Sequence, residues 1–77
     1  MSDTLMWEVR ATPGRREELL RWVEDTLDRD ADIYLGGEER IVVIARGVEK
    51  LPEPPAELLA RPVHQWPFEH HGTVKGG

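Results

Sequence analysis

Residues that could bind a metal ion are grouped in the last third of the chain. They are His64, Glu69, His70 and His71. Adjacent residues on an extended chain point to opposite sides, so His70 and His71 cannot share one ion without a turn. We therefore expect no metal site and no cofactor, and we interpret these histidines as solvated side chains.

A second candidate site is the segment Gly14-Arg15-Arg16, at the predicted start of a helix. Free N–H groups at a helix N-terminus, together with the guanidinium groups of Arg15 and Arg16, could hold a phosphate or a carboxylate. The segment has no glycine-rich loop, so solvated surface arginines are the alternative interpretation.

The aromatic segment Trp66-Pro67-Phe68 is the third candidate. Aromatic side chains can line a ligand pocket or anchor a protein interface, or the segment can be a structural lid pinned to the fold. Glu8 and Arg10 alternate onto one face of a predicted strand, where they could line a cavity or simply face solvent.

Catalytic groups are scarce. The chain has no cysteine, its only serine is Ser2, and no pair of carboxylates is spaced for acid–base chemistry. We assign no catalytic residues, and the sequence favours a non-catalytic protein over an enzyme without deciding between them. A net charge of −5 disfavours nucleic acid as a partner, because such binding needs a basic surface. No apolar run approaches the roughly 20 residues of a membrane span, and the N-terminus lacks the basic start of a signal peptide, so we expect a cytoplasmic protein.

The elements that must position these residues follow from hydrophobic periodicity. Residues 5–11 alternate as a half-buried strand, with Leu5, Trp7, Val9 and Ala11 on one face. Thr12 is a possible cap and Pro13 a possible first residue of a helix that should run to about residue 28. Residues 31–35 and 40–46 predict two strands joined by a turn at 36–39.

This order predicts an α+β fold with one main helix on a three-stranded sheet. A right-handed crossover places the third strand between the first two, in the order 1-3-2, within a core spanning residues 1–47. The central strand is apolar on both faces, so Met6, Val42 and Ile44 lie on a sheet face that the helix cannot cover.

Residues 48–77 differ in composition and form a proline-rich aromatic tail. A short second helix is expected at about 55–61, then extended chain, and the last residues should fray. The prolines bar residues 63–68 from an inner strand but allow an edge position or a path across the sheet. Either Leu58, Leu59, Trp66 and Phe68 cover the open face in a closed monomer, or two sheets meet in a dimer and the tail docks on the partner. We favour the homodimer, because a small core without disulfides gains most by doubling itself.

The order strand, helix, strand, strand over residues 5–46 resembles the first half of a ferredoxin-like module. The resemblance is to the dimeric α+β barrel proteins, which include antibiotic-biosynthesis-type monooxygenases. It implies that Val42 and Ile44 meet a second subunit. The chain departs from the module where prolines such as Pro52 and Pro54 replace a long second helix, and no catalytic motif of the family can be carried over.

Three functions are compatible with these patterns. The first is a small accessory protein that binds itself or a protein partner through the open face and the tail, with Met6, Val42, Ile44, His64, Trp66 and Phe68 in the binding surface. The second is a small-molecule-binding or monooxygenase-like module of the barrel type. The third is an anion binder built on Arg15 and Arg16.

Overall fold

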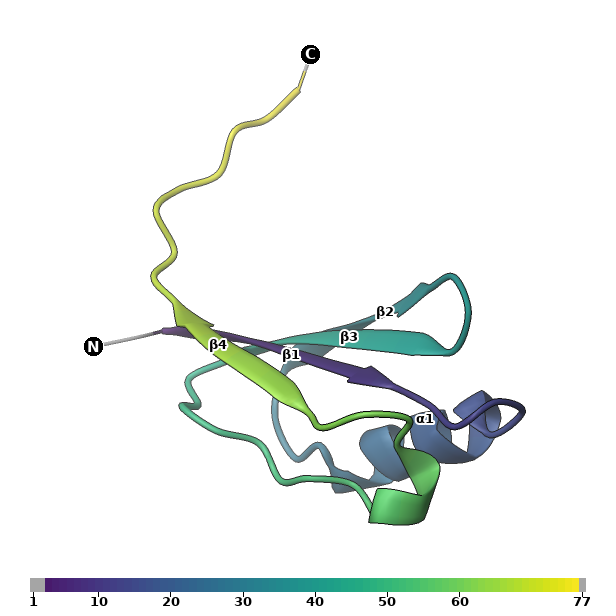
Figure 1. Ribbon diagram of the computed structural model, residues 1–77. Helices are drawn as coiled ribbons and strands as arrows, with labels where there is room; N and C mark the ends of the chain where they lie inside the picture. The colour runs from purple at the N-terminus through teal and green to yellow at the C-terminus, as the bar shows by residue number, and fades with distance from the viewer. Residues whose placement is uncertain (1–2, 77) are drawn as a thin grey trace.

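The computed structural model describes residues 3–76, and residues 1, 2 and 77, the last of which belongs to the predicted frayed end, lie outside it. Its elements are β1 (Thr4–Arg10), α1 (Arg16–Thr26), β2 (Ala31–Gly36), β3 (Arg40–Arg46), the 3-10 helix η1 (Ala56–Leu58) and β4 (His64–Phe68) (Figure 1). The strands form one sheet, and α1 and η1 lie on the same side of it. The predicted α+β class is therefore confirmed.

The sheet has four strands in the order β2-β3-β1-β4, and every neighbouring pair is antiparallel. The three predicted strands keep the order 1-3-2, but the prediction of a three-stranded sheet was wrong, because β4 adds to the free edge of β1. Pro67 lies opposite Leu5 in this register. A proline is tolerated there because an edge strand forms ladder hydrogen bonds on one side only.

The start of α1 differs from the prediction. Thr12 to Arg15 form a turn in which the Arg15 N–H donates to the Thr12 carbonyl at 2.9 Å, and Gly14 has φ +81°. Proline followed by glycine suits the two central positions of such a turn, so the helix begins at Arg16 rather than at Pro13. The Thr12 hydroxyl does not cap the helix but donates to the Glu57 carbonyl at 2.9 Å.

The core lies between the sheet and the layer formed by α1 and η1. Leu5, Trp7, Val9 and Ala11 are buried, which confirms the predicted inner face of β1. The other buried apolar residues are Leu19, Val23, Ile41, Val43, Ala45, Leu51 and Leu58.

The first part of the tail completes this layer. Leu51 and Leu58 are buried in the core, and η1 packs against α1. The side-chain amide of Gln65 on β4 accepts from the Leu51 N–H at 2.9 Å and donates to the Leu51 carbonyl at 3.1 Å. The predicted second helix at 55–61 is reduced to η1. Because this segment lies beside α1, it does not cover the opposite face of the sheet.

Candidate binding face

The sheet face opposite α1, called here the open face, brings together residues from all four strands. Met6 lies opposite Ile44 on β3 and opposite Trp66 on β4, and Val42 lies opposite Tyr34 on β2. Directly opposed residues of antiparallel strands share a face of the sheet. We define the apolar patch as Met6, Tyr34, Val42, Ile44, Trp66 and Phe68.

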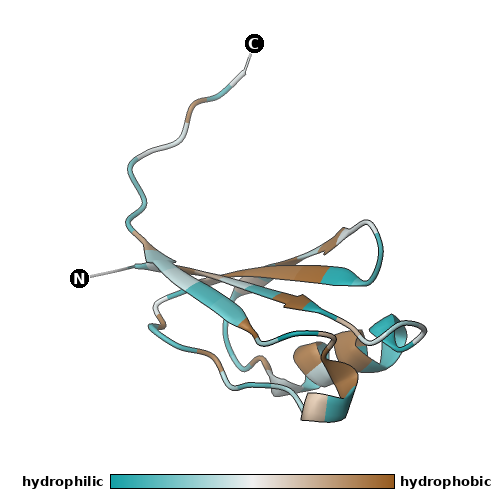
Figure 2. Ribbon diagram, viewed as in Figure 1, coloured by the Kyte–Doolittle hydropathy of each residue, from teal (hydrophilic) through white to brown (hydrophobic). Residues whose placement is uncertain are grey.

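The apolar patch is accessible to solvent. Tyr34 is 56% exposed, Phe68 50% and Trp66 40%, whereas Val42 and Ile44 are half-buried by their neighbours. Hydrophobic residues lie along β3 at the centre of the sheet (Figure 2). The closed monomer, in which the tail covers this face, is not the observed arrangement, and Trp66-Pro67-Phe68 is an edge strand rather than a lid.

An ion pair lies toward each end of the apolar patch. The Glu8 carboxylate forms an ion pair with Arg40 near the β2–β3 turn, 2.9 Å from the Arg40 Nε, and Asp32 accepts from Arg46 at 3.0 Å near the other end of β3. The Asp32–Arg46 pair is exposed and the Glu8–Arg40 pair is partly exposed, so each contributes roughly 0–1 kcal/mol to stability. The face therefore presents an apolar centre with charges of both signs at its ends.

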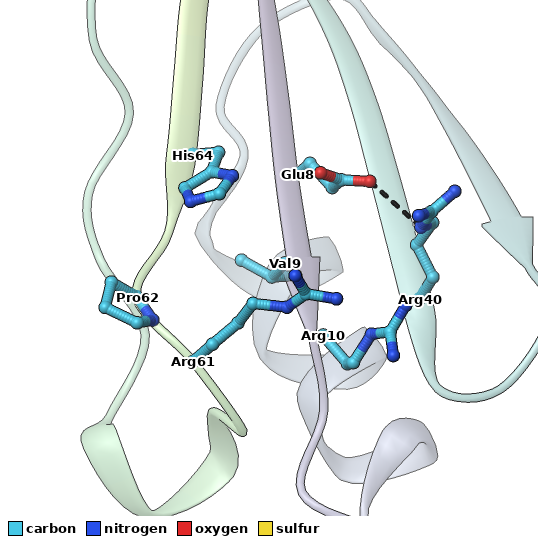
Figure 3. A pocket seen from close by; sticks show the side chains of 7 residues that line it. All are labelled: Glu8, Val9, Arg10, Arg40, Arg61, Pro62 and His64. Atoms are coloured by element: carbon cyan, nitrogen blue, oxygen red, sulfur yellow. Dashed lines mark ion pairs between the residues drawn. The ribbon is translucent and has the colours of Figure 1, made fainter.

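A small cleft at one corner of the open face gathers polar side chains from separate segments. It has a volume of about 10 Å³, and Arg10, Arg40, Arg61, Glu8 and His64 line it (Figure 3). These five residues are the basic corner. The cleft is too small for the barrel-type ligand cavity, which calls for roughly 300 Å³ or more.

Other contacts at this corner constrain its side chains. The His64 ring packs edge-on against Trp66, with ring centroids 5.5 Å apart. The Nε of Arg10 is buried without a hydrogen-bond partner in the described chain.

The arginines predicted to hold an anion at the helix start are bonded to the protein itself. Arg15 forms an ion pair with Glu18 at 2.7 Å and also donates to the Glu57 carbonyl at 3.4 Å, while Arg16 donates to the Gly36 carbonyl at 3.0 Å. The hydrogen bond from Arg15 lowers the pKa of Glu18, and the same bond raises the pKa of Arg15. These contacts tie the helix start to η1 and β2.

The candidate metal ligands are spread along the C-terminal segment. His64 lies on β4, and His70 lies beyond it, where its backbone N–H donates to the Asp3 carboxylate at 2.9 Å. This hydrogen bond is the main cause that lowers the pKa of Asp3, with a second contribution from the Thr4 hydroxyl. Within residues 3–76, no three histidine or carboxylate groups are placed to share a metal ion.

Sequence reasoning missed Arg40 and Arg61 as site residues. Alternation along β1 places Glu8 and Arg10 on one face, but Arg40 joins them only through the register between β1 and β3. Arg61 arrives through a hydrogen bond from the Ala60 N–H to the Arg10 carbonyl at 2.9 Å. The one feature of the sequence that could have pointed to Arg61 is its position directly before Pro62 and an extended segment.

Comparisons with known proteins provide no assignment. No protein-family model matches the chain, and no curated protein or solved structure shows significant similarity to it. Among the described residues, no helix combines the length and the apolar character needed to cross a membrane.

Proposed function

We propose that this protein is a non-catalytic interaction module that self-associates by packing the open faces of two copies against each other. The observation that carries the proposal is the uncovered apolar patch, to which all four strands contribute. Contiguous exposed apolar surface with a polar rim is typical of protein interaction sites.

A second copy suits this face because the face is self-complementary in charge. Glu8 and Arg40 lie at one end and Asp32 and Arg46 at the other. In a two-fold arrangement, residue i of one copy meets residue j of the other and the reverse contact also forms. Each acidic group can therefore approach an arginine of the partner while the apolar patches meet in the centre.

The area of the sheet sets a requirement on the interface. One face of a sheet of four strands, about 4.8 Å apart and about six residues long, has an area of roughly 400 Å². Two such faces packed together bury about 800 Å², whereas stable interfaces bury about 1,200–2,000 Å². The sheet faces alone therefore fall short of a stable dimer.

The C-terminal segment can supply the missing area. Residues 69–76 extend away from the sheet on the side opposite α1 (Figure 1), and Val74 in this segment is 95% exposed. Eight extended residues reach about 26 Å, which exceeds the width of about 19 Å of a four-stranded sheet. We therefore propose that the tail of each copy lies across its partner.

The strand order supports a ferredoxin-like arrangement as part of this proposal. The sheet order β4-β1-β3-β2 with antiparallel neighbours is that of a β-α-β-β-α-β module in which η1 stands in place of the second helix. The dimeric α+β barrel proteins resembled by residues 5–46 pack two such sheets face to face.

Mixed labelling tests the proposal at the level of single contacts. Isotope-filtered NOE spectra of an equal mixture of ¹³C-labelled and unlabelled chains should show contacts between copies from the methyl groups of Met6, Val42 and Ile44. The methyl groups of Leu19 and Val23 in the core should show only contacts within one copy. The proposal fails if the patch methyl groups show no contact between copies.

A further inference from the structure

The basic corner holds three guanidinium groups against one carboxylate. Arg40 forms an ion pair with Glu8, whereas Arg10 and Arg61 make no ion pair in the part of the chain that the structure describes. The side chains that line this cleft thus sum to a formal charge of about +2, while Glu38 and Glu39 line an adjoining hollow together with Arg10. The net charge of the whole chain is −5.

The fold itself forces these like charges together. Arg10 and Arg40 lie directly opposite each other in the register between β1 and β3, a position where like charges are destabilising. The backbone of Arg61 is fixed beside β1, because the neighbouring Ala60 N–H donates to the Arg10 carbonyl. An anion bound among the three arginines relieves their mutual repulsion.

The side chains leave donors for such an anion. The Arg61 side chain extends from the segment before β4 toward β1, on the same side as Arg10 and Arg40 (Figure 3). The buried Nε of Arg10 has no acceptor from residues 3–76. Guanidinium groups match carboxylate and phosphate oxygens in a bidentate geometry, so the unpaired donors fit an oxyanion better than any neutral group.

We propose that the basic corner binds an oxyanion, either the carboxylate of a small organic acid or a phosphate group. Arg10 and Arg61 contact the anion, and Glu8 holds Arg40 in place beside it. His64 lines the rim of the cleft, where its ring can donate a further hydrogen bond. All of these residues belong to one chain, so a monomer can bind the anion, whereas in the proposed dimer Glu8 and Arg40 also face the partner.

Titration of the intact protein with inorganic phosphate and with succinate tests the proposal. The readouts are isothermal titration calorimetry and the ¹H–¹⁵N resonances of the arginine Nε–H groups. We expect saturable binding of at least one anion with a dissociation constant of about 1–10 mM. Tighter binding of phosphate would identify a phosphate ligand, and tighter binding of succinate would identify a carboxylate ligand. Arg61→Gln should weaken binding about tenfold, because it removes a charged hydrogen-bond donor.

Arg21→Gln is the matched control, since it removes the same charge from an exposed position on α1, which lies on the other side of the sheet. It should leave the affinity within about twofold, because an exposed charge on the other side of the sheet is screened by salt. Arg10→Gln is a second test of the proposed anion site. If Arg10→Gln unfolds the protein, the test rests on Arg61→Gln alone, because Arg61 is exposed and its replacement should leave the fold intact. The proposal is overturned if neither anion shifts the Arg10 and Arg61 resonances at about 50 mM, or if Arg21→Gln and Arg61→Gln weaken binding equally.

Discussion

Two neighbouring residues of β2 provide a matched pair for testing the interface. Tyr34 belongs to the apolar patch and is 56% exposed, while Leu35 is 53% exposed and lies on the opposite face of the same strand. Replacing each with lysine adds the same charge, at almost the same exposure, to the same edge strand. The two substitutions differ mainly in the sheet face that they alter.

The expected effect can be estimated from the exposed area. A tyrosine presents about 200 Å², of which about 110 Å² remains accessible, so a two-fold dimer buries about 220 Å² through this residue, worth about 5.5 kcal/mol at about 25 cal/mol per Å². The lysine stem retains about half of this contact, which leaves a loss of about 2–3 kcal/mol. Tyr34→Lys should therefore raise the dimer dissociation constant roughly 100-fold, whereas Leu35→Lys should change it less than about threefold.

Sedimentation equilibrium over a range of protein concentrations measures both dissociation constants. Thermal unfolding of the two variants provides the control, because substitutions at exposed positions should alter the free energy of unfolding by no more than about 0.5 kcal/mol. Equal dissociation constants for Tyr34→Lys and Leu35→Lys would refute the assignment of the open face as the interface.

Three further predictions concern the elements that support this face. Gln65→Ala removes both hydrogen bonds to the Leu51 backbone and should lower the free energy of unfolding by about 2 kcal/mol. Gly14→Ala should cost about 1–2 kcal/mol because Gly14 has φ +81°, whereas Gly37→Ala should be neutral. The lowered pKa of Asp3 means that its hydrogen bond to the tail is fully formed above about pH 3.9, the ordinary pKa of aspartate, and is lost as the pH falls through the lower, folded value.

Each of these predictions has a direct measurement. Chemical denaturation gives the free energy of unfolding for the Gln65 and glycine variants, and an unchanged value for Gln65→Ala or equal values for the two glycine variants would contradict the structural account. The amide resonance of His70 should follow the Asp3 titration, with a midpoint below the ordinary pKa. A midpoint at or above that pKa, or an unchanged titration in Asp3→Asn, would show that the tail is not held at Asp3.

Local sequence patterns predicted the parts of the fold that depend on periodicity. The alternation along β1 correctly separated the buried Trp7 and Val9 from Met6 and Glu8, because side chains of a strand alternate between its two faces. The position of β4 could not be predicted in the same way. A segment that contains Pro67 can form an edge strand or no strand at all. It forms a strand here because the edge of β1 is free to pair with it, and this edge is not visible in the local sequence.

The open face and the basic corner differ in how far the sequence reveals them. Excess apolar residues on β3 are visible in the sequence, so Val42 and Ile44 could be assigned to an uncovered face. The basic corner depends on long-range contacts, since residues 10, 40 and 61 meet only through strand register and a backbone hydrogen bond. Anion binding by Arg15 and Arg16 stays a prediction, and the contacts of these two arginines with η1 and β2 could not be predicted from their local sequence.

The mass of the protein in solution tests self-association most directly. Sedimentation velocity at high protein concentration should give a species of twice the 8.8 kDa of one chain, and dilution should shift the population toward the monomer. A species that stays at 8.8 kDa at the highest concentration would contradict the proposed pairing of the open faces.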